Sequence, residues 1–396
     1  MEKGENSLPR RSARTGEEDA VRAVLSMILA AALWAAPALA AKPVVVGVLY
    51  NLTGSQASLD VPGLEGARLA AEAVNSKGGV KGRPLVLEVR DCGTDVERCR
   101  EAARELAALG VAAVVGLNDS DFALAAGEAV TLAKVPFVTA GATLPTLPRT
   151  LGPYFFMACF GDDAQAKALA KFAVRRKGIT SMMLTANRDF AFTTVLAGSF
   201  VKSFKLLGGD IPAQARYGAA PGGVLGSPVP ACLADGACQG AFVAGMPEDA
   251  PRTVKALREA GFKGPVFSGD GFDTPLLEQV GEMAKPGVFF STHVSYDSPR
   301  AEVRRFVEAW TRAHGSRPVS GFAALGHDAV ALVADALARA GSDEPAQLRR
   351  ALAQTRAFVG VTGRIGFEEP QEPPLKVVAI ERYDGVARVF EAEVQP

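Results

Sequence analysis

The 396-residue chain has no excess of charge of either sign, because 43 lysine and arginine residues balance 43 aspartate and glutamate residues. Proteins that bind nucleic acid through its phosphates carry a clear basic excess, so nucleic acid is not the expected partner. Histidine is also scarce, and His293, His314 and His327 stand far apart in the sequence. We therefore expect no metal centre built from clustered histidines.

The chain also lacks the short motifs of common enzyme classes. It contains no P-loop, no G-x-G-x-x-G after its first strand, no H-E-x-x-H and no G-x-S-x-G. The sequence spacing of Ser120, His327 and Asp328 does not support a hydrolase site built from these residues. We therefore expect a protein that is not an enzyme and that needs neither a cofactor nor a metal.

The N-terminal segment has the pattern of an export signal. Residues 23–41 carry no charge, follow an arginine and include an A-x-A pattern that closes at Ala40. We interpret residues 1–40 as a signal peptide, although an uncleaved run of this length could also span a bilayer. Because residues 1–20 are polar and charged, a start of translation near Val21 would give a more usual signal peptide.

The five cysteines agree with export to an oxidising compartment. Cys92 lies close to Cys99 in the sequence, and Cys232 lies close to Cys238. We predict one local disulfide in each pair. A Cys₄ zinc site is the alternative, but it would lack C-x-x-C pairs. The remaining Cys159 stands in an apolar run and is expected to be a buried free thiol.

Strand and helix patterns alternate along the rest of the chain. Residues 43–49 form a continuous apolar run, typical of a strand buried on both faces of a parallel sheet. Helical spacing follows over residues 64–77 and stops at two glycines. The alternation continues to residue 268, which predicts two doubly wound α/β units.

The predicted strands are 43–49, 84–89, 112–117, 136–139, 181–185, 213–217, 241–244, 265–268, 287–293, 358–367, 376–383 and 387–391. The predicted helices are 64–77, 96–109, 122–132, 163–177, 190–207, 250–260, 300–314, 319–340 and 345–354. A Gly/Pro-rich connection is expected over 221–237.

Small and polar residues stand where several predicted strands end. Ser120 follows the third strand, Gly141 and Thr143 follow the fourth, and Asp270 lies between two glycines after a later strand. Hydroxyls and N–H groups near helix N-termini suit a carboxylate, whereas Asp270 would face a cation. These residues would bind a zwitterion, although each one alone could equally cap a helix or a turn.

Five stretches of the sequence carry a family resemblance. They contain, in order, an opening strand with an L-T-G turn, an A-T-x-P-x-L block, a G-D-G strand end, a long apolar helix and a G-R-I-x-F turn. The chain thereby resembles the periplasmic substrate-binding proteins of ABC transporters, of the leucine/isoleucine/valine-binding type. The stretches are 44–91, 112–147, 261–272, 321–341 and 360–370, and the resemblance extends over residues 43–391.

The resemblance implies a type I periplasmic binding protein fold, with two α/β lobes joined by a three-strand hinge. Lobe 1 would comprise residues 43–160 and 294–358. Lobe 2 would comprise residues 161–293 and 359–396. The two lobes would then close on a ligand that binds between them.

Carried over position by position, the resemblance also implies ligand-binding residues. The ligand carboxylate would bind Ser120, Gly141 and Thr143, and an α-ammonium group would bind Asp270. This set implies an amino acid or a similar small carboxylate as the ligand.

Four further positions would surround the rest of the ligand. Leu59, Phe190 and Met246 stand where the family often has tyrosine, and Phe322 matches an aromatic position. The more apolar site favours an apolar amino acid, with an aromatic or aliphatic carboxylate or an amide as the alternative. Without an ammonium group, Asp270 would need another partner, since an unpaired buried acid is costly.

The resemblance finally implies partners and location. We expect a periplasmic monomer without a bound cofactor that delivers its small-molecule ligand to the membrane permease of an ABC transporter. A ligand sensor of the same fold is the alternative, and an exported enzyme would need catalytic residues that the sequence does not show.

Overall fold

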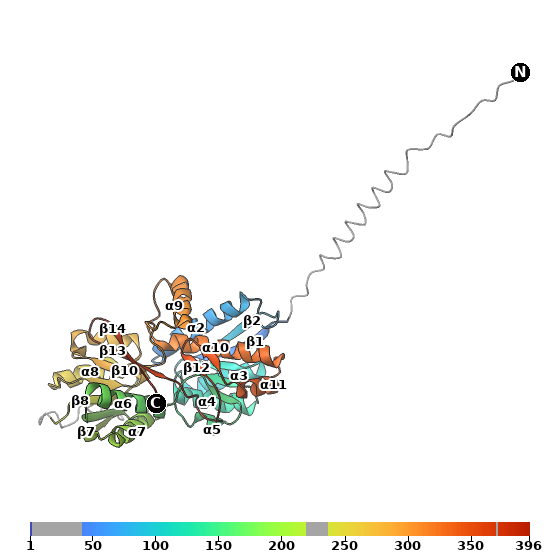
Figure 1. Ribbon diagram of the computed structural model, residues 1–396. Helices are drawn as coiled ribbons and strands as arrows, with labels where there is room; N and C mark the ends of the chain where they lie inside the picture. The colour runs from blue at the N-terminus through green and yellow to red at the C-terminus, as the bar shows by residue number, and fades with distance from the viewer. Residues whose placement is uncertain (2–41, 219–236, 370) are drawn as a thin grey trace. The chain divides into compact units, whose positions relative to one another are not determined.

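A computed structural model describes residue 1 and residues 42–218, 237–369 and 371–396 (Figure 1). The predicted signal peptide, almost all of the Gly/Pro-rich connection and Cys232 lie outside the described residues. Residues 43–396 form one unit, which contains two large sheets.

The first sheet has five parallel strands joined by helices. These elements are β1 (Val44–Tyr50), α2 (Ala57–Asn75), β2 (Leu85–Asp91), α3 (Val96–Ala108), β3 (Val114–Gly116), α4 (Ser120–Leu132), β4 (Phe137–Thr139), α5 (Leu147–Leu151) and β5 (Phe155–Met157). The strand order is β2-β1-β3-β4-β5. The order reverses direction at β1, as in doubly wound folds, so the carboxyl ends of β1 and β3 are adjacent.

The second sheet has seven strands and continues the chain after β5. Its elements are α6 (Asp162–Lys177), β6 (Ser181–Asn187), α7 (Ala191–Leu206), β7 (Asp210–Tyr217), β8 (Gly240–Ala244), α8 (Asp249–Glu259), β9 (Val266–Ser268), η2 (Asp270–Phe272), η3 (Pro275–Ala284), β10 (Val288–Thr292), β13 (Val378–Tyr383) and β14 (Arg388–Val394). The strand order is β14-β13-β10-β9-β8-β6-β7, and β13 and β14 pair antiparallel. The rest of the sheet is parallel.

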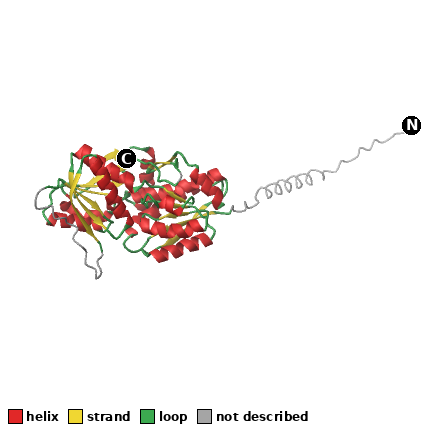
Figure 2. Ribbon diagram, turned by 90° about the horizontal axis from the view of Figure 1, so that it is seen from below, coloured by secondary structure: helices red, strands yellow, loops and turns green. Residues whose placement is uncertain are grey.

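Both faces of the second sheet are covered, because successive side chains of a strand point to opposite faces. Phe242, Phe267 and Phe289 belong to one apolar cluster with residues of α6 and α7. The neighbouring residues Val243 and Val266 belong to another cluster, with residues of α8 and η3. Figure 2 shows helices on both sides of the strands. The continuous apolar runs of the sequence therefore form strands buried on both faces.

Three more helices and a short hairpin complete the chain. They are α9 (Ala301–His314), α10 (Gly321–Ala340), α11 (Pro345–Ala353), β11 (Phe358–Gly360) and β12 (Gly363–Ile365). Helix α10 packs closely on α2, since a Cβ atom at Gly66 would lie 1.8 Å from the Ala323 carbonyl oxygen. Within the described residues, α10 is also the helix long and apolar enough to cross a membrane, but 78% of that stretch is buried in the protein. We therefore interpret α10 as a core helix.

The structure corrects several predicted boundaries. Helix α2 begins at Ala57 rather than at residue 64, because Pro62 in an early turn does not break it. The single strand predicted over 358–367 is a hairpin of two strands. Helix α5 and strand β5 were not predicted as elements, since both are too short to show a clear periodicity.

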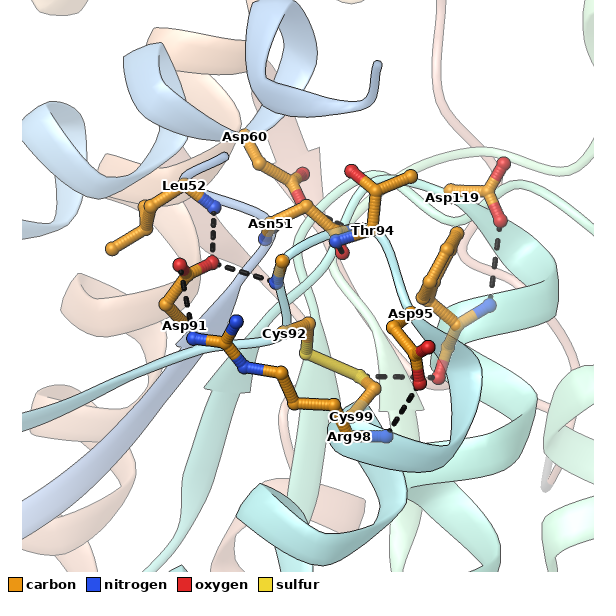
Figure 3. The surroundings of a disulfide bond; sticks show 12 residues. Asn51, Leu52, Asp60, Asp91, Cys92, Thr94, Asp95, Arg98, Cys99 and Asp119 are labelled. Carbon is orange, nitrogen blue, oxygen red and sulfur yellow. Dashed lines mark hydrogen bonds and ion pairs between the residues drawn. A yellow bond between two sulfur atoms is a disulfide. The ribbon is translucent and has the colours of Figure 1, made fainter. Parts of the chain in front are cut away.

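A disulfide joins Cys92 to Cys99, as the sequence predicts (Figure 3). It links the residue after β2 to α3, and both cysteines are buried. Asp95 lies between them and caps α3 by accepting a hydrogen bond from the Arg98 N–H at 2.8 Å. Cys159 is buried and unpaired, with its Sγ atom 3.3 Å from the Ala142 carbonyl oxygen. The second predicted disulfide stays a prediction.

Replacing both Cys92 and Cys99 with serine is expected to lower the free energy of unfolding by about 2–3 kcal/mol, because the open loop gains entropy in the unfolded chain. Denaturant unfolding of the oxidised wild type and the double variant measures this difference. Adding a reductant should lower the free energy of unfolding of the wild type toward that of the variant. Equal stability of the two oxidised proteins would contradict the prediction.

Candidate functional site

The carboxyl ends of β1 and β3 are held together by one buried carboxylate. Asp60 in α2 accepts hydrogen bonds from the N–H and side-chain amide of Asn51, at 2.7 and 2.9 Å. It also accepts from the N–H and side-chain amide of Asn118, at 3.1 and 2.8 Å. Figure 3 shows Asp60 and Asn51 close to the disulfide. Burial raises the pKa of Asp60 to about 7, and its four donors act in the opposite direction.

Helix α4 begins at Ser120, directly after this polar cluster. Asp119 caps the helix by accepting from the N–H groups of Asp121 and Phe122, at 2.9 and 3.3 Å. Burial, together with the charge of Asp121, raises the pKa of Asp119 to about 7. The N-terminus of α4 and the Ser120 hydroxyl therefore lie at the edge of the first sheet, where N–H groups favour an anion.

The stretch after β4 lies against Ser120. The Ser120 Oγ atom accepts a hydrogen bond from the Leu144 N–H at 3.2 Å. Thr143 between them is buried, and no described residue accepts a hydrogen bond from its N–H. Gly141 is needed for close packing, since a Cβ atom there would lie 2.5 Å from Asn118 Oδ1 and 3.1 Å from Phe322 Cδ1. Ser120, Gly141, Thr143 and Phe322 are thus neighbours.

Asp270 begins η2 at the carboxyl end of β9 and is already hydrogen-bonded. Its Oδ1 atom accepts from Gln165 Nε2 at 2.9 Å, and its N–H donates to Gln165 Oε1 at 3.1 Å. Its Oδ2 atom lies 2.9 Å from His293 Nε2. Burial lowers the pKa of His293, although Asp270 acts in the opposite direction. A neutral His293 would donate from Nε2 and leave Nδ1 without a partner among the described residues.

A second buried carboxylate connects Asp270 to Thr143. Asp162 opens α6, and its N–H donates to the Thr143 carbonyl oxygen at 2.8 Å. Its Oδ1 atom accepts from the same Gln165 amide nitrogen that binds Asp270, also at 2.9 Å. The Asp162 side chain is fully buried, and the Thr143 hydroxyl lies near enough to lower its pKa. Burial and the charge of Asp270 raise the pKa of Asp162 well above its usual range.

The remaining predicted residues lie less close to this group. The Phe322 ring is 6.1 Å from the His293 ring, so Phe322 contacts both halves of the site. The Leu59 carbonyl oxygen accepts from the Asn118 amide at 3.1 Å. Met246 belongs to an apolar cluster of the second sheet, and Phe190 packs against that cluster. Phe190 and Met246 are therefore attached to the apolar core of the second sheet.

The segments that run from one sheet to the other share a buried cation. Lys376, before β13, donates from Nζ to the Ala158 carbonyl oxygen at 2.8 Å and to Thr362 Oγ1 at 2.5 Å. Thr362 in turn donates to Asp328 of α10. Burial lowers the pKa of Lys376 to about 8, although Asp328 raises it. Lys376 thereby connects two crossing segments that are far apart in the sequence.

Sequence reasoning missed Asp60, Asp162, Gln165, His293 and Lys376. Asp162 and Gln165 do follow a strand, and their spacing puts both on one face of a helix, so the strand-end rule could have identified them. His293 gave no such signal, because its partner Asp270 is 23 residues away in the sequence.

Comparisons with known proteins agree with this architecture. Residues 43–384 match a family described as periplasmic binding protein. A protein of Brucella abortus named Leu/Ile/Val-binding protein homolog 8 is 26% identical over 340 residues, which cover 80% of this chain and 83% of that protein.

Two solved structures are also similar. The branched-chain amino acid transporter substrate-binding protein LivJ from Streptococcus pneumoniae, in complex with isoleucine, has a TM-score of 0.80 at 25% identity, covering 90% of this chain and all of that one. A solute-binding protein of an ABC transporter from Rhodopseudomonas palustris, in complex with benzoate, has a TM-score of 0.76 at 18% identity, covering 89% and 97%. The second likeness shows the fold alone.

An Asp119→Asn substitution is expected to make the stability of the protein less dependent on pH between about pH 4 and pH 7. The pKa of Asp119 is higher in the folded than in the unfolded chain, so its contribution to stability is lost as pH rises from about 4 through about 7. Asparagine also caps helices but does not ionise. The variant should therefore gain stability relative to the wild type as the pH rises from about 4 to about 7, as measured by denaturant unfolding.

The exposed Ser76, at the end of α2, offers a control. Ser76→Asn should leave the pH dependence of unfolding unchanged, because it removes no ionisable group. Identical pH dependence of Asp119→Asn and the wild type would contradict the expected titration of Asp119.

Proposed function

Given that the chain belongs to the periplasmic binding protein family, with its two-lobe type I fold, we propose that it captures a small carboxylate-bearing ligand between its lobes and delivers it to an ABC permease. One observation carries the proposal: the contacts of Ser120, Gly141 and Thr143 lead through Asp162 to Asp270. We propose the periplasm as its location, which two cysteine pairs and the expected signal peptide support.

The ligand carboxylate would bind at the N-terminus of α4. The Thr143 N–H and the Ser120 hydroxyl are donors there, and the helix N-terminus favours negative charge. Gly141 would let the backbone come close to the ligand. Ser120 and Thr143 are each only 2% exposed, so an anion bound to them would be shielded from water and salt.

An apolar amino acid is the first candidate ligand. The side-chain end of the site would be lined by Leu59, Phe190, Met246 and Phe322, which carry no charge. The Leu/Ile/Val-binding names of relatives and the isoleucine complex of a similar structure support this class. Asp270 would then bind the α-ammonium group.

An aromatic or aliphatic carboxylate is the second candidate. The observation that favours it is the contact of His293 Nε2 with Asp270, because this contact supplies a protein partner for the acid. The neutral His293 would then donate a hydrogen bond to Asp270 in place of a ligand ammonium group. The benzoate complex of a solved structure with a similar fold supports this class.

Ligand entry would need the lobes to move apart, since the residues of the proposed site are buried. We propose the lobe boundaries given above, with lobe 1 at 43–160 and 294–358 and lobe 2 at 161–293 and 359–396. Two sets of contacts support these boundaries. Helix α10 packs near β3 and β4, all within lobe 1, and β13 pairs with β10, both within lobe 2. Closure would bring the Asp270 side of the site onto a ligand already held by lobe 1.

Calorimetry of the mature protein against leucine, valine, phenylalanine, aromatic acids and small amides tests the proposal. Ser120→Ala and Asp270→Asn are each expected to weaken binding by about 1–3 kcal/mol, since each removes a polar contact from a buried site. Ser76→Ala, at the exposed end of α2, is the control and should bind like the wild type. Wild-type affinity in the Ser120 and Asp270 variants would exclude these residues from the site.

A further inference from the structure

One hydrogen bond joins α4, which follows β3 of the first sheet, to α7, which follows β6 of the second sheet. Asp121, in the first turn of α4, accepts with its Oδ2 atom from the Ala191 N–H at 3.4 Å. Ala191 is the first residue of α7, and the two helices are in contact. The bond therefore spans the two proposed lobes.

The N-terminus of α7 is not capped by its own N-cap residue. That residue is Phe190, which has no side-chain atom for a hydrogen bond, and the first turn of α7 contains no acid. A helix N-terminus presents unpaired N–H groups and a partial positive charge, so a carboxylate beside it is favourable. Asp121 supplies this carboxylate from the other lobe. Burial raises the pKa of Asp121, whereas the bond from Ala191 acts in the opposite direction.

The bond lies far from the segments that cross between the lobes. Two of the proposed crossings connect to β10 and β13, and the third leads into α6, which contacts both strands. In the second sheet β6 stands three places from β10. Neighbouring strands are about 4.8 Å apart, so this distance is roughly 14 Å. Rotation about the crossing segments therefore separates Asp121 from Ala191, and the bond forms only when the lobes are closed.

We propose that Asp121 is a latch for the closed form, because its carboxylate stabilises the N-terminus of α7 only when the two lobes have come together. The inference rests on the proposed function, since the closure concerned is closure on a ligand held by Ser120 and Thr143. Asp121 acts through the population of the closed form rather than by contact with the ligand. It is thus a positioning residue for α7.

The decisive variant changes the partner of Asp121 rather than Asp121 itself. Asp121 follows Ser120, so its removal also changes the charge near a bound carboxylate. Ala191→Pro removes the N–H donor and leaves that charge in place. Proline suits the first position of a helix, and Phe190 already has the extended backbone that precedes proline, with φ −122° and ψ 140°.

Calorimetry with leucine and with benzoate as probes measures the effect. Ala191→Pro is expected to bind the probe about two- to fivefold more weakly than the wild type, as loss of a carboxylate at a helix N-terminus predicts. In an Asp121→Ala background, Ala191→Pro should cause no further loss, because the bond is already absent. Wild-type affinity of Ala191→Pro, or an equal loss in both backgrounds, would overturn the latch.

Ala301→Pro is the matched control. Ala301 is also the first residue of a helix, α9, and no described residue accepts a hydrogen bond from its N–H. This variant should bind the probe like the wild type. If Ser120→Ala weakens binding and Ala191→Pro does not, the latch is wrong and the proposed function stands. The reverse result keeps the latch and removes Ser120 from the site.

Hydrogen exchange provides a measurement that needs no ligand. The amides in the first turn of α7 should exchange faster in Asp121→Ala than in the wild type, because the closed form shields them. Should Ala191→Pro fail to fold, or should neither probe bind, this comparison decides alone. Equal exchange in the two proteins then overturns the proposal.

Discussion

Helices pack on the faces of both large sheets, and this constraint determines where the chain can place polar groups. A polar side chain on either face would be buried among apolar residues such as Phe242 and Phe267 without a partner. The carboxyl edge of a sheet is different, because strand ends, turns and helix N-termini meet there and offer N–H groups. Asp60, Asp119, Asp162 and Asp270 all lie at such positions.

These four acids are buried, but their surroundings differ. Asp60 receives four N–H donors and connects β1, α2 and β3, so its role is structural. Asp119 caps α4 and thereby places Ser120. Asp162 and Asp270 both accept from the Gln165 amide, and Asp270 also contacts His293. The hydrogen bonds of Asp162 and Asp270 thus join α6 to the carboxyl end of β9, where the proposed site lies.

The same contacts give a physical reason for closure around a ligand. Ser120, Gly141 and Thr143 belong to the first sheet, whereas Asp270 and Gln165 belong to elements of the second. The proposed zwitterion would contact both groups, with its carboxylate facing the hydroxyls of the first sheet and its ammonium group facing Asp270. Lys376 connects the crossing segments by hydrogen bonds to Ala158 and Thr362. These bonds would hold the crossing segments together while the two sheets move relative to each other.

The amino-acid sequence by itself determined the alternation of strands and helices, the two α/β units and the pairing of Cys92 with Cys99, because periodicity and short-range spacing are local properties. It also indicated Ser120, Gly141, Thr143 and Asp270, since strand ends are visible in the sequence. Only the tertiary structure decided that His293 and Gln165 contact Asp270, across 23 and 105 residues. Only the tertiary structure, too, brings Asp162 to the side-chain amide of Gln165. Charge balance in a buried site depends on residues that are distant in the sequence, and no local sequence pattern shows which of these residues are in contact.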